Sequence, residues 1–513
     1  MSDYFKQKSI WLWQNAEKIL IITFLATFTL NVRKVFLTPY SYLNGEFNEY
    51  TTSSFSWADL LMILIILIYT IKWLLRQGET LGTGEVQDDN GSVKQYNNNS
   101  DKSSTPRFPQ NVSHFLCSIN NYLCQVFKGE TILLLLFLIW TMLSVSWSVY
   151  KPIAIYRTAN LLVIIAFISI LAANLRDKKR LKIAFFALLL NGVFQSALGI
   201  AQFLNNGSVG LHFLGESIVS QNLPGVAKIV IAGEKHIRAY GTFPHPNVMA
   251  GFLLIPVFLL VSSLLFRTRQ AQGVSEKVSH ETFFSGIPRK GAIVSLAVVS
   301  LGFFLTFSRS AFLGLFFGLL ALFLVNFKSK FACFKPLQRR VFYIKVFLLL
   351  LLIICVSFVL LRNTSLFSRQ SLAERNFYGN VSRATISEHP IFGIGIGQSV
   401  FSEFKNYPDL EGWQYQPVHN VYLLIFSELG AIGLILFLLF LFNIVRHCVW
   451  RERDTKLSLT HLAFYFIIIS FLFLALFDHF FWDIKIGMIT FALAIIFPRI
   501  VADNHKLQNN TKK

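Results

Sequence analysis

The chain has 513 residues, of which 54% are hydrophobic, only 14% are charged and 53 are phenylalanine. Its mean hydropathy of +0.52 argues against a soluble protein, because so much apolar surface is difficult to bury in a water-soluble core but can face lipid. The net charge of +20 does not indicate nucleic-acid binding, since the lysines and arginines cluster in short segments between apolar runs.

Apolar runs of about the 20 residues that a membrane-spanning helix needs recur along the chain. They predict an all-α polytopic membrane protein of about twelve transmembrane helices. These are expected at 16–32, 57–75, 131–150, 153–174, 183–204, 248–266, 291–307, 310–327, 344–361, 418–443, 461–478 and 484–501. The run from 291 to 327 is divided at Arg309, because an arginine at the bilayer centre costs roughly 2.5 kcal/mol or more and a turn at the surface avoids that cost.

The charges between these helices predict their orientation. With the N-terminus in the cytoplasm, the cytoplasmic connections include 176–180, 267–290, 328–340 and 446–456, all rich in Lys and Arg, as the positive-inside rule requires. The connections on the other face, at about 33–56, 205–247 and 362–417, mix both signs, and the last one is the short segment 479–482 between Asp478 and Asp483. Both termini are therefore predicted to be cytoplasmic.

The chain thus divides into N-terminal helices (1–75), a cytoplasmic linker (76–130), central helices with arginine motifs (131–361), an extracytoplasmic loop (362–417), C-terminal helices (418–501) and a cytoplasmic tail (502–513). The first two thirds of the linker are predicted to be disordered, because their polar, Gly- and Asn-rich sequence cannot bury enough surface to fold. Residues 114–127 are a candidate interfacial helix.

Several simple features of the sequence narrow the class further. The five cysteines lack metal-ligand spacing and none falls on the predicted outer face, so we expect neither a zinc site nor a disulfide. The sequence Asn31-Val-Arg-Lys34 after the first apolar run is not a cleavage site, so no signal peptide is expected.

Three segments that carry candidate functional residues are predicted to lie on the outer face. In the first, Arg238 precedes Pro244-His-Pro-Asn247, where the prolines set an extended approach to a helix that Asn247 is expected to cap. A helix N-terminus beside an arginine attracts phosphate. An isolated loop arginine is more often simply solvated.

The second segment, Thr306-Phe-Ser-Arg-Ser310, places Arg309 between hydroxyl groups in an otherwise apolar run. Because an arginine at membrane depth is costly, this position favours a functional role for Arg309 over the alternative, in which its side chain only extends to the lipid headgroups.

The third segment is the loop that leads to His419, the side chain best suited to move a proton near neutral pH. Arg375 and Arg383 in this loop are anion-binding candidates that rank below Arg238 and Arg309. The sequence Pro390-Ile-Phe-Gly-Ile-Gly-Ile-Gly397 lacks the features of a phosphate loop and predicts a flexible turn on the membrane surface. Glu428, about two turns into the helix after His419, is expected to orient His419 or a neighbouring helix, or to pair with an arginine.

Four segments, in this order, resemble the O-antigen ligase/polymerase family of bacterial envelopes, most densely over about residues 185–445. They are Arg238 with Gly241-Thr-Phe-Pro-His-Pro-Asn247, then Thr306-Phe-Ser-Arg-Ser310, then His389-Pro-Ile-Phe-Gly-Ile-Gly395, and finally His419-Asn-Val-Tyr-Leu423 with Glu428-Leu-Gly430. The helix count and the long outer loop before the His-Asn pair also match. The family includes ligases, chain polymerases and protein O-oligosaccharyltransferases, and the sequence leaves the choice among them open.

The resemblance implies a lipid-sugar glycosyltransferase fold in the bacterial inner membrane. Such an enzyme takes a glycan from a polyprenyl diphosphate, such as undecaprenyl diphosphate, on the outer face and passes it to a lipid, glycan or protein acceptor. It implies that Arg238 and Arg309 engage the diphosphate, that His419 activates the acceptor hydroxyl, and that no metal or other cofactor is needed. Further expected diphosphate ligands are Asn247 and Arg383, and the expected supporting residues are His245, Ser308, Asn420 and Glu428.

The chemistry of these residues agrees with that expectation. Arginines can neutralise a leaving diphosphate, and direct displacement would invert the anomeric carbon, since no paired carboxylates call for a covalent intermediate. A flippase of lipid-linked saccharides is the alternative, but it would need charges along a path through the bilayer, and no internal repeat supports a transporter. A structural scaffold would explain the helices but not the three converging segments.

Overall fold

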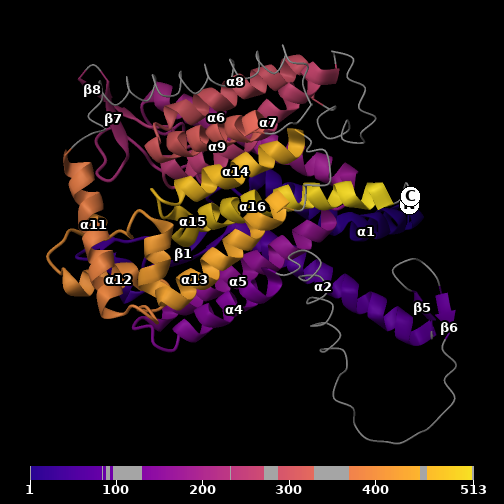
Figure 1. Cartoon of the computed structure of the whole chain (residues 1–513), viewed down its shortest axis with the longest axis horizontal. Helices are drawn as coiled ribbons and strands as arrows, with labels where there is room; N and C mark the ends of the chain where they lie inside the picture. The colour runs from indigo at the N-terminus through magenta and orange to yellow at the C-terminus, as the bar shows by residue number, and fades with distance from the viewer. Residues whose placement is uncertain are drawn as a thin grey trace, which may run out of the picture.

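The computed structural model describes residues 2–83, 85–87, 93–95, 130–231, 233–270, 287–328, 369–450 and 459–510. In these ranges the chain is mostly helical (Figure 1). The longer helices are α1 (Ser2–Thr27), α2 (Trp57–Thr83), α4 (Glu130–Ser144), α5 (Lys151–Asn174), α6 (Lys178–Asn205), α7 (Pro246–Gln270), α8 (Arg289–Leu305), α9 (Arg309–Lys328), α11 (Arg369–Glu388), α13 (Val421–Trp450), α14 (Leu459–Leu474) and α16 (Lys485–Asn510). The short helices α12 (Ser399–Asn406) and α15 (Phe480–Asp483) lie in connections.

Each predicted membrane helix except 344–361 overlaps an observed helix, and 344–361 lies outside the described residues. Five helical segments in the described ranges are long and apolar enough to cross a membrane: Trp57–Leu75, Lys151–Asn174, Lys179–Asn205, Pro246–Leu264 and Val421–Arg446. Shorter apolar helices run over Ile132–Ser144, Arg309–Ala321 and Lys485–Phe497. The helical class is confirmed and the apolar helices support a polytopic membrane protein, whereas the number twelve and the orientation stay predictions.

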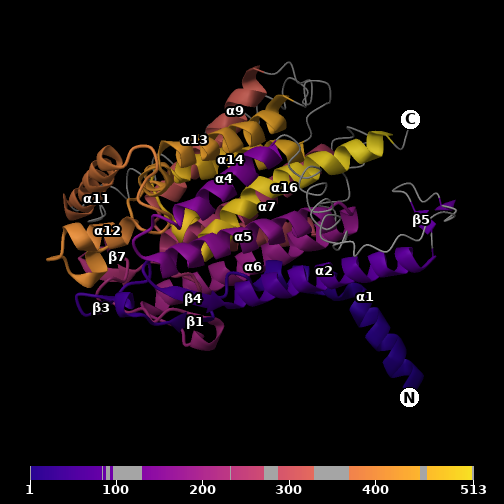
Figure 2. The same cartoon turned by 90° about the horizontal axis from the view of Figure 1, so that it is seen from below.

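The three long connections predicted to share one face gather at one end of the helices, which we call the loop end. There, β1 (Arg33–Phe36) pairs antiparallel with β4 (Ser53–Ser56), β2 (Tyr42–Leu43) with β3 (Glu46–Phe47), and β7 (Lys228–Ile231) with β8 (Glu234–Ile237). Figures 1 and 2 show these strands together with α11 and α12 at the loop end. The chain ends and the strands β5 (Glu85–Gln87) and β6 (Val93–Gln95) lie at the opposite end.

The abundant phenylalanines build much of the contact between helices. Phe24 of α1 and Phe167 of α5 are fully buried with ring centroids 4.3 Å apart, and Phe28 meets Phe252 of α7 edge to face at 5.7 Å. Small residues allow closer approach elsewhere, since a Cβ added to Gly318 of α9 would lie 2.1 Å from Ser470 Oγ of α14. Close packing through small residues is the usual way in which helices associate inside a bilayer.

Two regions for which the sequence predicts no regular structure contain some helix or strand among the described residues. Residues 369–388 and 399–406 of the predicted loop form α11 and α12. The predicted linker begins with the last turns of α2 and contains the β5–β6 pair, while the rest of it, including the candidate helix 114–127, lies outside the described residues.

The glycine-rich turn is held by hydrogen bonds to α13, contrary to the flexible turn that the sequence predicts, whereas its place at the membrane surface stays a prediction. Helix α13 is interrupted at Gly430, where φ is 67° and ψ is −172°. The carbonyl groups of Ser427 and Glu428 are thereby released from the helix, and they accept hydrogen bonds from the backbone of Ile394 (3.0 Å) and Gly395 (2.8 Å). The turn is therefore pinned to the break in α13.

Candidate functional site

Arg238 follows β8 directly and is held by contacts on two sides. Its Nε donates to the carbonyl oxygen of Thr306 at 2.5 Å, at the end of α8, and its Nη2 donates to Asn247 Oδ1 at 2.7 Å. Burial lowers the pKa of Arg238 to about 10, Tyr240 opposes that shift, and the positive charge of Arg309 adds to it. The guanidinium stays protonated at pH 7. Its contact with Thr306, three residues before Arg309, brings Arg238 to the turn that carries Arg309.

Asn247 joins Arg238 to an acidic residue far along the chain. Its Nδ2 donates to Asp478 Oδ2 at 2.7 Å, so the amide bridges a cation and an anion. The expectation that Asn247 caps α7 is wrong, because α7 already begins at Pro246, whose missing N–H suits the first helical position. His245 precedes the helix instead, and its Nδ1 accepts from the Asn247 backbone at 3.2 Å.

Arg309 begins α9 after a sharp turn, as its position in the apolar run predicted. Phe307 between α8 and α9 has a positive φ of 48°, which is unusual for a side chain of this size. The neighbouring hydroxyl groups of Ser308 and Ser310 are buried and lie 3.2 Å apart. The turn thus brings Arg309, partly buried, to the same place as Arg238.

His419 lies just before α13 in a site formed by aromatic rings. The ring of Tyr378 on α11 stacks on it at 5.9 Å, and the ring of His479 meets it edge to face at 4.9 Å. Burial lowers the pKa of His419 to about 3; His479 and Arg375 add to that effect and Asp478 opposes it. His419 is therefore neutral at pH 7, with its buried Nδ1 lacking a hydrogen-bond partner among the described residues.

His479 was not among the residues that sequence reasoning proposed. It is buried, its Nδ1 lies 2.7 Å from Asp483 Oδ2, and its backbone N–H donates to Asp478 Oδ1 at 3.0 Å. Burial lowers the pKa of His479, but the charge and hydrogen bond of Asp483, with help from Asp478, raise it overall. The sequence signal that could identify His479 is the presence of three titratable groups, Asp478, His479 and Asp483, within six residues of an otherwise apolar region.

Arg375, not Arg383, reaches this group from the outer loop. Its Nη1 donates to the carbonyl oxygen of Phe477 at 3.1 Å, and its charge lowers the pKa values of both His245 and His419. Arg383 is exposed on α11 and donates to Asn380 Oδ1 at 2.6 Å, and among the described residues no interaction joins it to Arg238 or Arg309. The role of Arg383 as a diphosphate ligand stays a prediction, and the position of Arg375 makes it a further candidate.

The remaining predicted residues act on the backbone and on neighbouring helices. Asn420 Oδ1 accepts from the backbone of Tyr422 (2.9 Å) and Leu423 (3.0 Å), and thus caps α13 directly after His419. Glu428 is buried and accepts from Trp482 Nε1 at 2.8 Å and from the Ser399 backbone at 3.4 Å. It therefore ties α13 to α12 and α15.

These contacts bring eight side chains into one group, which we call the arginine–histidine cluster. Its members are Arg238, His245, Asn247, Arg309, Arg375, His419, Asp478 and His479. The cluster contains three arginines, three histidines, one asparagine and one aspartate, all at the loop end. In the described ranges, no three or more His, Cys, Asp or Glu side chains are grouped to hold a metal ion. The arrangement suits an anionic ligand and a proton transfer beside it.

These features define a helical protein with membrane-spanning segments and a cationic, imidazole-containing site at one end. Residues 294–438 match the family described as O-antigen ligase. This match covers less than half of the chain, and it confirms the resemblance to the O-antigen ligase/polymerase family, a family of glycosyltransferases. The matched segment includes Arg309, Arg375 and His419. No curated protein matches the sequence.

Proposed function

We propose that this chain is a glycosyltransferase of the inner membrane that transfers a glycan from a polyprenyl diphosphate to an acceptor hydroxyl on the extracytoplasmic face. The observation that carries the proposal is the convergence of Arg238 and Arg309 with His419, from separate parts of the sequence, at the loop end. In the reaction, the acceptor oxygen forms a bond to the anomeric carbon, the bond from that carbon to the diphosphate oxygen breaks, and the diphosphate leaves with the electron pair. The anomeric configuration is thereby inverted.

The arginines supply the charge that the leaving group needs. A diphosphate gains negative charge as its bond to the sugar breaks, and guanidinium groups held in place beforehand stabilise that charge without reorganising. Arg238 is fixed from two sides, by Thr306 and Asn247, and Arg309 is presented at the start of a helix. Their mutual repulsion is relieved when an anion binds between them, which favours the occupied state.

His419 receives the proton of the acceptor hydroxyl. In the empty site its pKa of about 3 makes it a weak base. A bound diphosphate brings negative charge beside the imidazole and offsets Arg375, so its pKa rises towards the range in which a histidine is an effective general base. Donor binding thereby activates the base only when there is a leaving group to displace.

A pocket lined almost wholly by apolar residues suits the prenyl chain. It encloses about 810 Å³ of space between atoms, which includes open solvent, and lies between α4, α5, α13 and α16, with Phe137, Ile164, Phe437 and Phe491 among its walls. Val421 and Trp482 also line it, two residues after His419 and three after His479. A prenyl chain in this pocket would bring its diphosphate to the loop end.

Reconstitution tests the proposal. Purified protein in liposomes is supplied with polyprenyl-diphosphate-linked glycan and candidate lipid, glycan and protein acceptors, without added metal, and the glycosidic product is measured. We expect transfer by the wild type, and a loss of about a hundredfold or more for Arg309→Ala and His419→Ala. The matched controls are Arg289→Ala and His212→Ala, both of exposed residues outside the arginine–histidine cluster.

The same assay separates the competing functions. Movement of labelled lipid-linked glycan across the bilayer, without any new glycosidic bond, would instead establish a flippase. Retained transfer in folded Arg309→Ala and His419→Ala protein would contradict the roles of these two residues in the reaction.

A further inference from the structure

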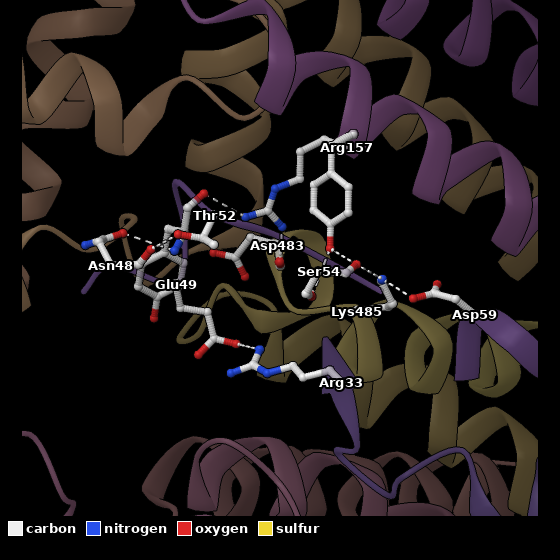
Figure 3. Close-up of polar contacts among 11 residues, drawn as sticks. Arg33, Asn48, Glu49, Thr52, Ser54, Asp59, Arg157, Asp483 and Lys485 are labelled. Atoms are coloured by element: carbon white, nitrogen blue, oxygen red, sulfur yellow. Dashed lines mark hydrogen bonds and ion pairs between the residues drawn. The ribbon is translucent and has the colours of Figure 1, made fainter. Parts of the chain in front are cut away.

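Besides the apolar pocket between the helices, a pocket with polar walls lies at the loop end, beside the arginine–histidine cluster. It encloses about 650 Å³ of space between atoms, which includes open solvent, and its walls come from β1 and β4, from α5, and from the start of α16 (Figure 3). Its lining includes Tyr156, Arg157, Asn160, Asp483 and Lys485 but, among the described residues, not Arg238, Arg309 or His419. The proposed roles of the diphosphate and prenyl sites leave this pocket unassigned.

Internal ion pairs hold the walls of the pocket. Arg33 pairs with Glu49, and Lys485 pairs with Asp59, as Figure 3 shows. Lys485 Nζ also donates to the carbonyl oxygen of Ser54 at 3.1 Å and lies 5.3 Å from the ring centroid of Tyr156. Because these charges neutralise one another, the pocket does not demand a strongly charged ligand.

Hydrogen-bonding capacity remains in the wall next to His479. Arg157 donates to the carbonyl oxygens of Asp483 and, at 3.2 Å, of Tyr50, but its buried Nε has no partner in the described part of the chain. The side chain of Asp483 is only 7% exposed, and its Oδ1 likewise has no hydrogen-bond partner there. Buried donors and acceptors without partners are costly, and a ligand with hydroxyl groups would satisfy both.

The pocket adjoins the reacting groups through two connections. Asp483 lines it and pairs with His479, whose ring meets that of His419. Pro244 also lines it, and the residue after Pro244 is His245, beside Arg238. On the other side of His479, Asp478 is joined through Asn247 to Arg238. His479 therefore stands between the pocket and the arginines.

The position of the pocket relative to the arginines indicates that it binds the acceptor and not the donor. In a direct displacement, the acceptor oxygen approaches the anomeric carbon from the side opposite the leaving diphosphate. A site that is separated from the arginines by the histidines lies on the side that the acceptor requires. Hydroxyl, amide and paired charged groups around the pocket match a saccharide, which presents many hydroxyl groups and little net charge.

We propose that this pocket binds the saccharide part of the acceptor and directs one of its hydroxyl groups towards His419, which rests on the glycosyl transfer proposed above. His479, held by Asp483, acts as a positioning residue: it fixes the ring of His419 and links the acceptor pocket to the base.

The test compares the two substrates of the transfer reaction in Asn160→Ala and Tyr156→Phe proteins. We expect the KM for the acceptor to rise about tenfold in Asn160→Ala, as loss of one hydrogen bond to a ligand predicts, and less in Tyr156→Phe, while the KM for the donor and kcat stay within about twofold. Asn205→Ala and Tyr407→Phe are matched controls, because both residues are exposed at the loop end and outside the pocket. An increase in the KM for the donor, or unchanged KM values for both substrates, would overturn the inference.

Binding without turnover separates this inference from the proposed function. The full-length His419→Ala protein in nanodiscs is titrated with oligosaccharide released by mild acid from the envelope of the producing cells, and saturation-transfer NMR measures contact. We expect signals that weaken at least severalfold when Asn160→Ala is added. Absence of signal, or signal unaffected by Asn160→Ala, contradicts the pocket assignment. If binding is found but the wild type transfers no glycan, the proposed function fails and the saccharide site stands.

His479 needs a separate measurement because a structural role would also lower activity. For Asp483→Asn we expect the pKa of His479 to fall and the acid limb of the pH–kcat profile to move, with the donor KM little changed. A uniform loss of activity at all pH values would show that the pair only stabilises the fold.

Discussion

One side-chain amide, that of Asn247, connects Arg238 to the segment that carries His479 through two hydrogen bonds. Asn247 accepts from Arg238 and donates to Asp478, so a carboxylate in its place could keep the first contact but not the second. The orientation that the proposed function requires of Arg238 therefore depends on a residue of the last connection, which is distant in sequence.

Replacement of Asn247 tests this bridge. For Asn247→Ala we expect kcat/KM for the donor to fall about tenfold to a hundredfold, since hydrogen bonds to charged groups contribute about 1.5–3 kcal/mol. Asn247→Asp should lose at least as much, because its carboxylate would lie against that of Asp478. Steady-state rates at varied donor concentration measure both. Activity equal to that of the wild type in either variant would show that the bridge does not position Arg238.

Buried imidazoles make stability depend on pH. The folded pKa of His419 is about 3, below the usual value near 6.5 for an unfolded chain, so the unfolded state binds a proton first as the pH falls. The stability that this group provides is complete above pH about 6.5 and is lost as the pH falls towards the folded pKa. The same direction holds for His245, whose pKa burial also lowers to about 3.

Thermal unfolding in detergent micelles measures the effect. Between about pH 7 and pH 4.5, we expect the midpoint temperature to fall less steeply for His419→Gln than for the wild type, because the variant has no imidazole to protonate on unfolding. His212→Gln, which removes an exposed imidazole, should fall as the wild type does. Equal slopes for His419→Gln and the wild type would show that His419 is not held neutral.

At the scale of elements, the break in α13 holds the glycine-rich turn against the helix that follows His419. Gly430 has a positive φ of 67°, and an added Cβ would lie 2.1 Å from the carbonyl oxygen of Ile391. Gly393 faces the same contact from the other side, where a Cβ would lie 2.4 Å from the carbonyl oxygen of Glu428. Both backbones therefore approach as closely as only glycine permits.

Substitution of Gly430 should lower the free energy of unfolding by more than the positive φ alone explains. We expect Gly430→Ala to destabilise the protein by about 2–4 kcal/mol, combining backbone strain with displacement of the turn. Gly45→Ala is the matched control, because its φ is 84° but nothing lies within 4 Å of the added Cβ; strain alone should cost about 1 kcal/mol. Denaturation followed by tryptophan fluorescence measures both, and a similar loss in the two variants would contradict the importance of the close approach.

At the scale of the whole molecule, the long connections lie at one end of the helices and the chain ends at the other (Figures 1 and 2). This separation agrees with the alternation of charge between connections, and the membrane orientation follows as a prediction. The proposed glycosyl transfer requires the loop end to be extracytoplasmic, because the acceptor pocket and the arginine–histidine cluster both lie there.

Cysteine labelling of intact cells tests that orientation. After the five native cysteines are replaced by serine, a single cysteine at exposed Asp409 or Lys235 should react with a membrane-impermeant maleimide in intact cells. A cysteine at Ser100 in the linker should react only after the membrane is permeabilised. The reverse pattern would place the arginine–histidine cluster on the cytoplasmic side and exclude the proposed reaction.

Much of the architecture could be predicted because lipid imposes a strong and local constraint. The lengths of apolar runs located the helices, and the cost of burying Arg309 located the turn between α8 and α9. Segments without such a constraint were less predictable: the polar residues of α11 give no length signal, and the pinned form of the glycine-rich turn depends on a break in another helix.

The same contrast holds for the site. The sequence by itself determined the helical class, the family resemblance and the pair of chemistries, cationic and imidazole, because these follow from residue types and their local spacing. Only the tertiary structure decided that Arg375 rather than Arg383 joins the cluster, that His479 and Asp483 stand beside His419, and that a polar pocket lies next to them. The physical reason is that apolar burial is encoded residue by residue, whereas polar partners are chosen by helices that meet only after the chain has folded.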